Sequence, residues 1–278
     1  MSTPSEPRLI GARRTAELLD HYEIVPRKRL GQNFIVDPNT IRMVLDRAQL
    51  GSDDRVLEVG AGVGALTVAI ASAARHVTAI EVDERLAPVL RDVVGDIENV
   101  DVVIGDALAL DLTTLDATRM MGNLPYSVAS EVILRVLQVM PKIRDLTVMV
   151  QKEVGDRLTA RPGDKLYGKS CLEVRYFART NVLGRASRRA FLPVPHVDSV
   201  VVRLERRTEP PSVGSDPFLT IVQAAFSQRR KTMRNALAST DFGDQDVEAV
   251  LASAGIDREA RPQEVGFEQF IELAGHLA

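Results

Sequence analysis

Cysteine and aromatic residues are scarce in this sequence. It contains one cysteine, no tryptophan and 4% aromatic residues in total. A single cysteine excludes an internal disulfide and any metal site built from several cysteines, and Cys171 reads as a small buried side chain. The core is therefore expected to consist mainly of valine, leucine, isoleucine and alanine.

Long hydrophobic runs are also missing. The first 30 residues contain no apolar stretch of signal-peptide length, and no later stretch approaches a membrane span. We therefore expect a soluble, cytoplasmic protein that needs no metal. With 278 residues, 45% of them hydrophobic, the chain is long enough for one large core and a smaller attached domain.

An excess of positive charge is absent overall, because the net charge is −3 and the isoelectric point about 5.9. Taken alone, this argues against a nucleic-acid-binding protein. The charges are distributed unevenly, however: residues 221–240 carry four basic residues and no acid, whereas the tail from Asp241 is acidic. Two local basic segments, 184–207 and 221–240, therefore remain candidates for contact with RNA phosphates.

Apolar strand-like runs alternate with helix-length segments through the first half of the chain. The expected strands cover residues 55–59, 76–82, 100–105, 118–124, 145–151 and 197–205. Near-continuous apolar strands separated by helices indicate a parallel sheet covered on both faces. We predict an α/β, doubly wound Rossmann-like fold, which binds its ligand at the carboxyl ends of the strands.

A segment rich in proline, glycine and serine, residues 208–217, reads as a linker, and only helix signals follow it. We therefore predict three parts. Residues 1–26 form an N-terminal extension that is partly disordered, residues 27–208 form the α/β domain, and residues 209–278 form a small all-helical domain.

A glycine turn and two acids follow the first three predicted strands. The turn contains Gly60 and Gly62, which allow the backbone to approach a ligand closely. Glu81 ends the second predicted strand, where a carboxylate can bind ribose hydroxyls. Asp106 follows the third predicted strand, where its carboxylate can accept a hydrogen bond from the amino group of an adenine. These features predict a nucleoside cofactor, either a nicotinamide dinucleotide or S-adenosylmethionine (SAM).

The fourth strand ends in Asn123-Leu124-Pro125-Tyr126, which favours SAM. A nicotinamide enzyme needs a group that titrates near its hydride site, and this motif offers none. It instead suits a flat base with an amino group: the Asn123 carbonyl and a backbone carbonyl accept its hydrogens, Pro125 stiffens the turn, and Tyr126 stacks on the ring. The motif thus predicts an aromatic amine aimed at a methyl donor.

In combination these motifs resemble the ribosomal RNA adenine N6,N6-dimethyltransferases, from about Arg27 to Phe270. The resemblance rests on RKRLGQNFIVD (27–37), EVGAGVGALT (58–67), NLPY (123–126), FLPVPHVDSVVVRL (191–204) and FSQRRKTMRNAL (226–237). Two departures are mild: Ile35 replaces the commoner leucine, and Ala61 stands where the family often has proline. The last block is most typical of the bacterial members that act on the small subunit.

The resemblance implies a SAM-dependent enzyme that dimethylates two adjacent adenosines in the 3′-terminal hairpin of small-subunit (16S) rRNA. It implies that Phe191 sandwiches the target adenine opposite Tyr126. The implied cofactor contacts are Asn33, Ile35, Glu58, Gly60, Gly62, Glu81, Asp106 and Asn123. The expected RNA contacts are Lys28, Arg29, Arg188, Arg189, Arg229, Arg230, Lys231 and Arg234. The expected partner is the small ribosomal subunit or an assembly intermediate, and a monomer is expected.

Three alternatives stay open at this point. A large-subunit rRNA adenine methylase of the antibiotic-resistance type would share the cofactor motifs. A ribosome-assembly factor that only binds RNA would not need the acids and Asn123. A nicotinamide dehydrogenase would bind NADH and not SAM.

Overall fold

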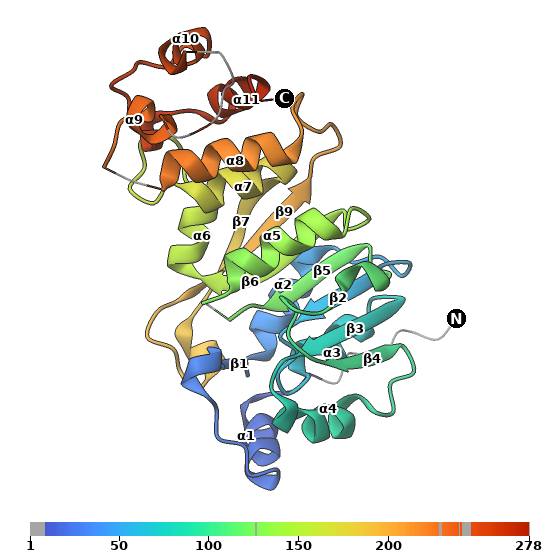
Figure 1. Cartoon of the computed structure of the whole chain (residues 1–278). Coiled ribbons are helices and arrows are strands. Elements are labelled where there is room, and N and C mark those ends of the chain that lie inside the picture. Colours follow the sequence, from blue (N-terminus) through green and yellow to red (C-terminus); the bar gives the residue numbers. More distant parts are fainter. Residues whose placement is uncertain (1–8, 126, 228–229, 239, 241–245, 278) are drawn as a thin grey trace. The chain divides into compact units, whose positions relative to one another are not determined.

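The computed structural model describes residues 9–125, 127–227, 230–238, 240 and 246–277 (Figure 1). Two compact units are formed by the described residues. Residues up to 155 and residues 181–206 make up unit 1, and residues 156–180 with those from 207 onward make up unit 2. Residues 156–180, which the sequence-based boundary assigned to the α/β domain, therefore pack with the helical unit.

A seven-stranded sheet with the order β4-β3-β2-β5-β6-β9-β7 dominates unit 1 (Figure 1). Neighbouring strands from β4 to β6 are parallel, and β9 pairs antiparallel with β6. The strands are β2 (Arg55–Val59), β3 (His76–Glu81), β4 (Val100–Ile104), β5 (Arg119–Asn123), β6 (Asp145–Gln151), β7 (Ala178–Ala186) and β9 (Ser199–Arg206). The predicted doubly wound α/β fold is confirmed, with β7 as a strand that the sequence reasoning missed.

Helices cover both faces of this sheet, because the strands are apolar on both sides. The helices of unit 1 are α1 (Ala12–His21), α2 (Pro38–Ala48), α3 (Ala65–Ala71), α4 (Ala87–Val94) and α5 (Ala129–Val139), and α6 (Lys152–Thr159) begins in unit 1 and ends in unit 2. Val56, Val77 and Met121 pack in one core with α2, α3 and α4. The alternate residues Leu57 and Ile80 are equally buried on the other face, where Figure 1 shows α5.

The N-terminal segment joins unit 1 through a two-stranded ladder. Here β1 (Phe34–Ile35) pairs antiparallel with β8 (Phe191–Leu192), so that Phe34 faces Leu192 and Ile35 faces Phe191. Helix α1 lies within the predicted N-terminal extension, and the predicted disorder near Met1 falls on residues 1–8, outside the described residues. The ladder brings residues 30–35 to the carboxyl ends of β2 and β5.

Unit 2 is helical and contains most of the scarce aromatic rings. Its helices are α7 (Lys169–Phe177), α8 (Ser215–Phe226), α9 (Met233–Leu237), α10 (Val247–Ser253) and α11 (Phe267–Gly275). Phe218 is fully buried, and its ring lies 4.9 Å from that of Tyr176 and 5.5 Å from that of Phe267. The Tyr167 hydroxyl donates to the carbonyl of Val265 at 2.9 Å, so residues 156–180 are fixed to the C-terminal helices. No described helix in either unit is long and apolar enough to cross a membrane.

Candidate functional site

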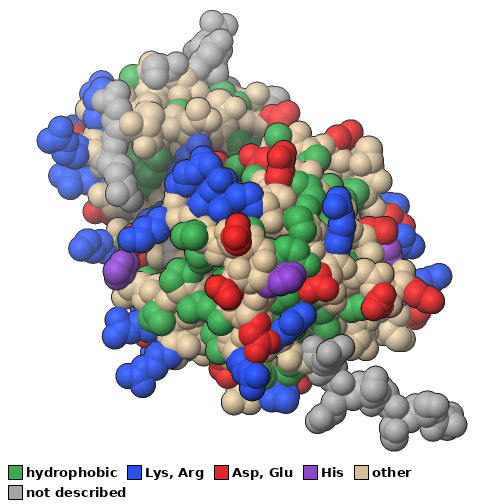
Figure 2. Space-filling view, turned by 90° about the horizontal axis from the view of Figure 1, so that it is seen from below, with side chains coloured by type: hydrophobic (Ala, Val, Ile, Leu, Met, Phe, Trp, Pro, Cys, Tyr) green, Lys and Arg blue, Asp and Glu red, His purple; other side chains and the backbone are tan. Residues whose placement is uncertain are grey.

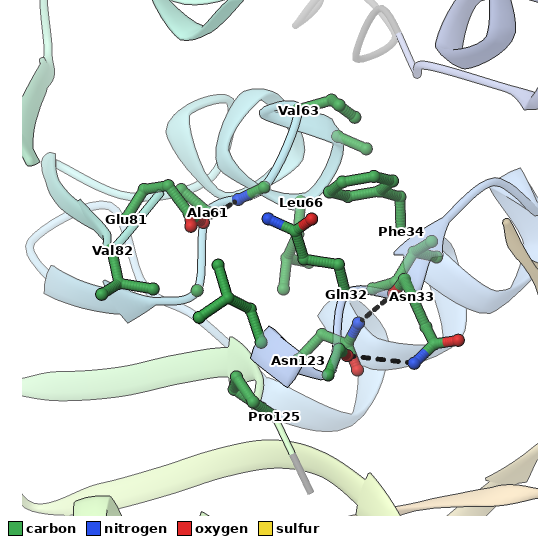
Figure 3. Close-up of a pocket in the computed structure, with 16 residues that line it drawn as sticks. Gln32, Asn33, Phe34, Ala61, Val63, Leu66, Glu81, Val82, Asn123 and Pro125 are labelled. Atoms are coloured by element: carbon green, nitrogen blue, oxygen red, sulfur yellow. Dashed lines mark hydrogen bonds between the residues drawn. The ribbon is translucent and has the colours of Figure 1, made fainter. Parts of the chain in front are cut away.

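A pocket opens at the carboxyl ends of β2, β3 and β5, where the doubly wound fold predicts a ligand (Figure 3). It encloses about 590 Å³ of space between atoms, including the part open to solvent. Its lining residues are Leu30, Gly31, Gln32, Asn33, Phe34, Ile35, Gly60, Ala61, Gly62, Val63, Ala65, Leu66, Glu81, Val82, Asn123 and Pro125. Seven predicted site residues are thus brought to one pocket: Asn33, Ile35, Gly60, Gly62, Glu81, Asn123 and Pro125.

The glycine turn forms the floor of the pocket, and its backbone conformation requires glycine. Gly60 and Gly62 have φ angles of +83° and +60°, which other residues rarely adopt. A Cβ atom on Gly62 would lie 2.9 Å from Cδ1 of Phe34, and one on Gly60 would lie 3.2 Å from the backbone carbonyl oxygen of Asn123. The absent side chains therefore let Phe34 of the N-terminal segment and the backbone of Asn123 lie close to the turn.

Glu81 is held in place by the backbone on two sides. Its Oε2 accepts from the N–H of Gly62 at 2.8 Å, and its Oε1 accepts from the N–H of Asp83 at 2.9 Å. Burial raises the pKa of Glu81, while these two backbone bonds oppose that shift. Each carboxylate oxygen has a second lone pair, so both can accept a further hydroxyl group. The residue is preoriented for a diol at the edge of the pocket.

Glu58 lies beneath the pocket rather than in its wall. It is fully buried, and neither carboxylate oxygen has a regular hydrogen bond. Burial raises its pKa to about 7, and the charge of Glu81 adds to this effect, while the nearby Thr67 hydroxyl lowers it. The sequence predicted a cofactor contact for Glu58, but the structure leaves this side chain out of the pocket lining.

Asn123 ends β5, and its side-chain amide makes a hydrogen bond to the N-terminal segment. Its Nδ2 donates to the backbone carbonyl of Asn33 at 2.8 Å, which fixes the side-chain plane (Figure 3). The Asn123 carbonyl oxygen, which is an acceptor, is left for a ligand. The Pro125 carbonyl accepts from Val128 N–H at 3.2 Å and so fixes the turn after the strand. Tyr126, predicted to stack on a base, lies outside the described residues.

Besides Glu58, two other predicted residues lie outside this pocket. Asp106 is exposed, and its Oδ1 accepts from Leu108 N–H at 2.9 Å, which is the turn-capping role of such an acid. It still follows Gly105, whose N–H donates to the Glu81 carbonyl at 2.8 Å. Phe191 is 1% exposed and packs in the core opposite Ile35. A ring buried in this way has no free face, so the structure gives no support to the predicted stacking on adenine.

Basic residues predicted to bind RNA are exposed in both units. Lys28, Arg29, Arg188 and Arg189 belong to unit 1, and Arg230, Lys231 and Arg234 belong to unit 2. Arg234 donates to Glu248 at 2.7 Å and so carries a partly neutralised charge. Arg229 lies outside the described residues. Figure 2 shows one face of the molecule, on which Lys and Arg side chains stand among exposed hydrophobic ones.

Sequence reasoning missed several lining residues, chiefly Gln32, Phe34 and Val82. Gln32 and Phe34 flank Asn33 in the RKRLGQNFIVD segment, and Val82 directly follows Glu81. The signal that could have found these three residues was their position next to predicted contacts in the sequence. It was weak because residues 30–35 are brought across the pocket by contacts between distant segments, among them the β1–β8 ladder.

Comparisons with known proteins agree with this geometry. A family model described as "Ribosomal RNA adenine dimethylase" matches residues 25–278. The chain is 41% identical to the "Ribosomal RNA small subunit methyltransferase A" of Thermobifida fusca, covering 99% of this chain and 98% of the relative.

Solved structures with the same fold are also similar to this chain. The "23S rRNA methyltransferase ErmE" is 30% identical, with a TM-score of 0.68 over 88% of this chain and 99% of that one. A dimethyladenosine transferase from Plasmodium falciparum, 24% identical, shares the fold with a TM-score of 0.75 over 85% of this chain and 94% of that one. With a family match over nearly its whole length, the chain belongs to the ribosomal RNA adenine dimethylase family.

Proposed function

We propose that this protein transfers methyl groups from SAM to N6 of two adjacent adenosines in the 3′-terminal hairpin of small-subunit rRNA. The observation that carries the proposal is the Asn123 amide, fixed by Asn33 at the mouth of a pocket that holds a glycine turn and Glu81. The 41% identity to a relative named for the small subunit favours that substrate over the large subunit.

The pocket fits SAM better than a dinucleotide. Glu81 provides acceptors for ribose hydroxyls, and the turn of Gly60 and Gly62 lines the pocket. Glu81 is the one charged side chain among the described lining residues, and Glu58 lies buried beneath it. A lining with one acid and no lysine or arginine suits a cationic sulfonium and disfavours a diphosphate.

The protein's own residues act mainly by positioning. The Asn123 carbonyl oxygen and a backbone carbonyl of the same turn accept the adenine N6 hydrogens and aim its lone pair into the pocket. Pro125 keeps this turn rigid, and we propose that Tyr126 stacks on the base. SAM, when bound, supplies a methyl group made electrophilic by its sulfonium. The target base leaves its stack to enter, which costs less in a hairpin loop than in a duplex.

Glu81→Gln is expected to weaken SAM binding by about tenfold, the scale of one lost charge-assisted hydrogen bond. The introduced NH₂ group would face a backbone N–H of Gly62 or Asp83, so the side chain would turn away from its present position. Calorimetry with SAM and with NADH measures this directly. Glu98→Gln, an exposed acid before β4, is the matched control and should bind SAM normally.

Arg230 and Lys231 are expected to contact RNA phosphates. Replacing both with alanine should reduce the slope of log affinity against log salt by about 1.5, since each phosphate contact contributes about 0.7 to 0.9. Arg234→Ala should change the slope less, because Glu248 already neutralises this guanidinium in part. RNA binding at several salt concentrations measures the slope, with exposed Arg13→Ala as the control. An unchanged slope in the double variant would remove these residues from the RNA surface.

We also propose that the protein acts as a cytoplasmic monomer on the small subunit or an assembly intermediate. The exposed basic residues of both units support contact with a large structured RNA.

The decisive experiment is mass spectrometry of rRNA after incubation of unmethylated small and large subunits with labelled SAM. Two dimethylated adenosines near the 3′ end of the small-subunit RNA are expected. Modification confined to the large subunit would instead favour methylation of 23S rRNA, the activity for which ErmE is named. SAM binding without methylation of either subunit would favour a ribosome-assembly factor.

A further inference from the structure

Two consecutive residues of the N-terminal segment contact opposite sides of the pocket. The Gln32 side chain donates from Nε2 to Oδ2 of Asp83, after β3, at 2.9 Å. The backbone carbonyl of Asn33 accepts from Nδ2 of Asn123, at the end of β5, at 2.8 Å. Residues 32–33 therefore connect the strand that provides the ribose-binding acid with the strand that aims the target amine.

The Asp83 end of this connection is firmly fixed. Its carboxylate accepts from the guanidinium of Arg85 at 3.0 and 2.5 Å and is 1% exposed. The Arg85 hydrogen bonds, aided by Gln32, hold the pKa of Asp83 at about 2 against the effect of burial, so the side chain stays ionised. Through its N–H, Asp83 also binds Oε1 of Glu81. A shift of Gln32 would therefore move Asp83 and, through the N–H of Asp83, the carboxylate of Glu81.

The Gln32 end is fixed as well. Its Oε1 accepts from the N–H of Arg27 at 2.7 Å, so the amide uses both its donor and its acceptor. Loss of the side chain would leave the buried carboxylate of Asp83 and the N–H of Arg27 each without one partner. Residues 30–35, which form one wall of the pocket, would then be held mainly by the β1–β8 ladder and by Asn123.

We propose that Gln32 is a positioning residue for methyl transfer, which sets the spacing between the SAM side of the pocket and Asn123. The inference rests on the proposed function and adds a residue to it. Gln32 need not touch the reacting atoms, since it acts through Asp83 on one side and through Asn33 on the other. Errors of about 1 Å in the separation of reacting groups lower rates by as much as about 100-fold.

The first test is Gln32→Ala, assayed on unmethylated small subunits over a range of SAM concentrations. We expect kcat to fall by about tenfold or more, and the KM for SAM to rise by a smaller factor. Arg14→Ala is the matched control: Arg14 also connects the N-terminal segment to the α/β body, through Asp92 at 3.3 Å, but far along the chain from the pocket lining. This variant should retain the wild-type kcat.

The second test exchanges the two partners. Gln32→Glu alone places two carboxylates together, and Asp83→Asn alone removes the ionised acceptor, so both should lower kcat. The double variant Gln32→Glu, Asp83→Asn restores a hydrogen bond of reversed polarity, and the introduced carboxylate still accepts from Arg27. Nη2 of Arg85 loses Oδ2 of Asp83 in this variant, but the carboxylate introduced at position 32 keeps a negative charge beside it. We expect its kcat to recover by at least about threefold over either single variant, a coupling of the size found between contacting residues. A purely structural role would restore the melting temperature and kcat in parallel, whereas a positioning role lowers kcat in single variants that are still folded at the assay temperature.

Three outcomes separate the possibilities. If the wild-type protein methylates small subunits and Gln32→Ala retains the wild-type kcat, the positioning role is overturned while the proposed function stands. Additive losses in the exchange, without recovery, overturn it too, whatever the melting temperatures of the variants. If the wild-type protein binds SAM but methylates no subunit, the proposed function is wrong. Gln32 then has no methyl transfer to position, and its proposed role is overturned as well.

Discussion

Replacing Asn123 with alanine is expected to reduce methyl transfer by about 100- to 1000-fold, the range found when one preorganised hydrogen-bonding group is removed from an active site. The variant loses the carbonyl that accepts from adenine N6. It also loses the hydrogen bond to the Asn33 carbonyl, so residues 30–35 lose one attachment to β5. Single-turnover assays with labelled SAM and small subunits measure the rate of transfer, and calorimetry measures SAM affinity, which should fall less than tenfold.

Asn123→Asp separates the two contributions. Aspartate keeps an acceptor for the adenine amine but cannot donate to the Asn33 carbonyl, so its rate should lie between those of wild type and Asn123→Ala. Asn39→Ala, at an exposed position of α2, is the matched control and should be fully active. A wild-type rate in Asn123→Ala would contradict the assignment of this residue, and equal rates in both Asn123 variants would mean that the donated hydrogen bond carries the effect.

Much of unit 1 could be predicted because its information is local. The apolar runs at 55–59 and 145–151 match β2 and β6 residue for residue. The period of two in a strand also fixes which side chains share a face: Glu58 lies beside Met121 in the parallel register, so both face the α3 side of the sheet. Acids and amides at the ends of neighbouring parallel strands must then meet at one edge.

The parts that could not be predicted depend on contacts between distant segments. The chain gives no local sign that residues 156–180 pack with the C-terminal helices, a contact made by Tyr167 with Val265. Phe191 looks exposed in a basic, proline-rich segment, but its pairing with Ile35 buries it. Gln32 meets Asp83 across 51 positions. In each case tertiary packing, which no periodicity encodes, decided the outcome.

Glu58→Gln is expected to stabilise the free protein by about 3 kcal/mol at pH 8 and to leave its stability unchanged at pH 4. The wild-type carboxyl has a pKa of about 7 when folded, against an unperturbed value of 4.5, because burial disfavours the charge. Below pH 4.5 both states bind the proton and no penalty exists. Between pH 4.5 and 7 the unfolded state loses its proton first, so wild-type stability falls as pH rises. Above pH 7 the penalty is constant.

Urea unfolding followed by circular dichroism, at several pH values between 4 and 8, measures the difference between the two proteins. Each unit of pKa shift corresponds to about 1.4 kcal/mol, so the two stability curves should separate over this window and then run parallel. Glu98→Gln, an exposed acid, should follow the wild type throughout. A constant difference across the whole range would mean that Glu58 is ionised when folded, with its charge satisfied by a partner. Among the described residues neither oxygen of Glu58 has a hydrogen-bond partner, so we expect the two stability curves to diverge. The buried carboxylate therefore lowers the stability of the free protein, and a cationic ligand bound in the pocket above it would help to offset this loss.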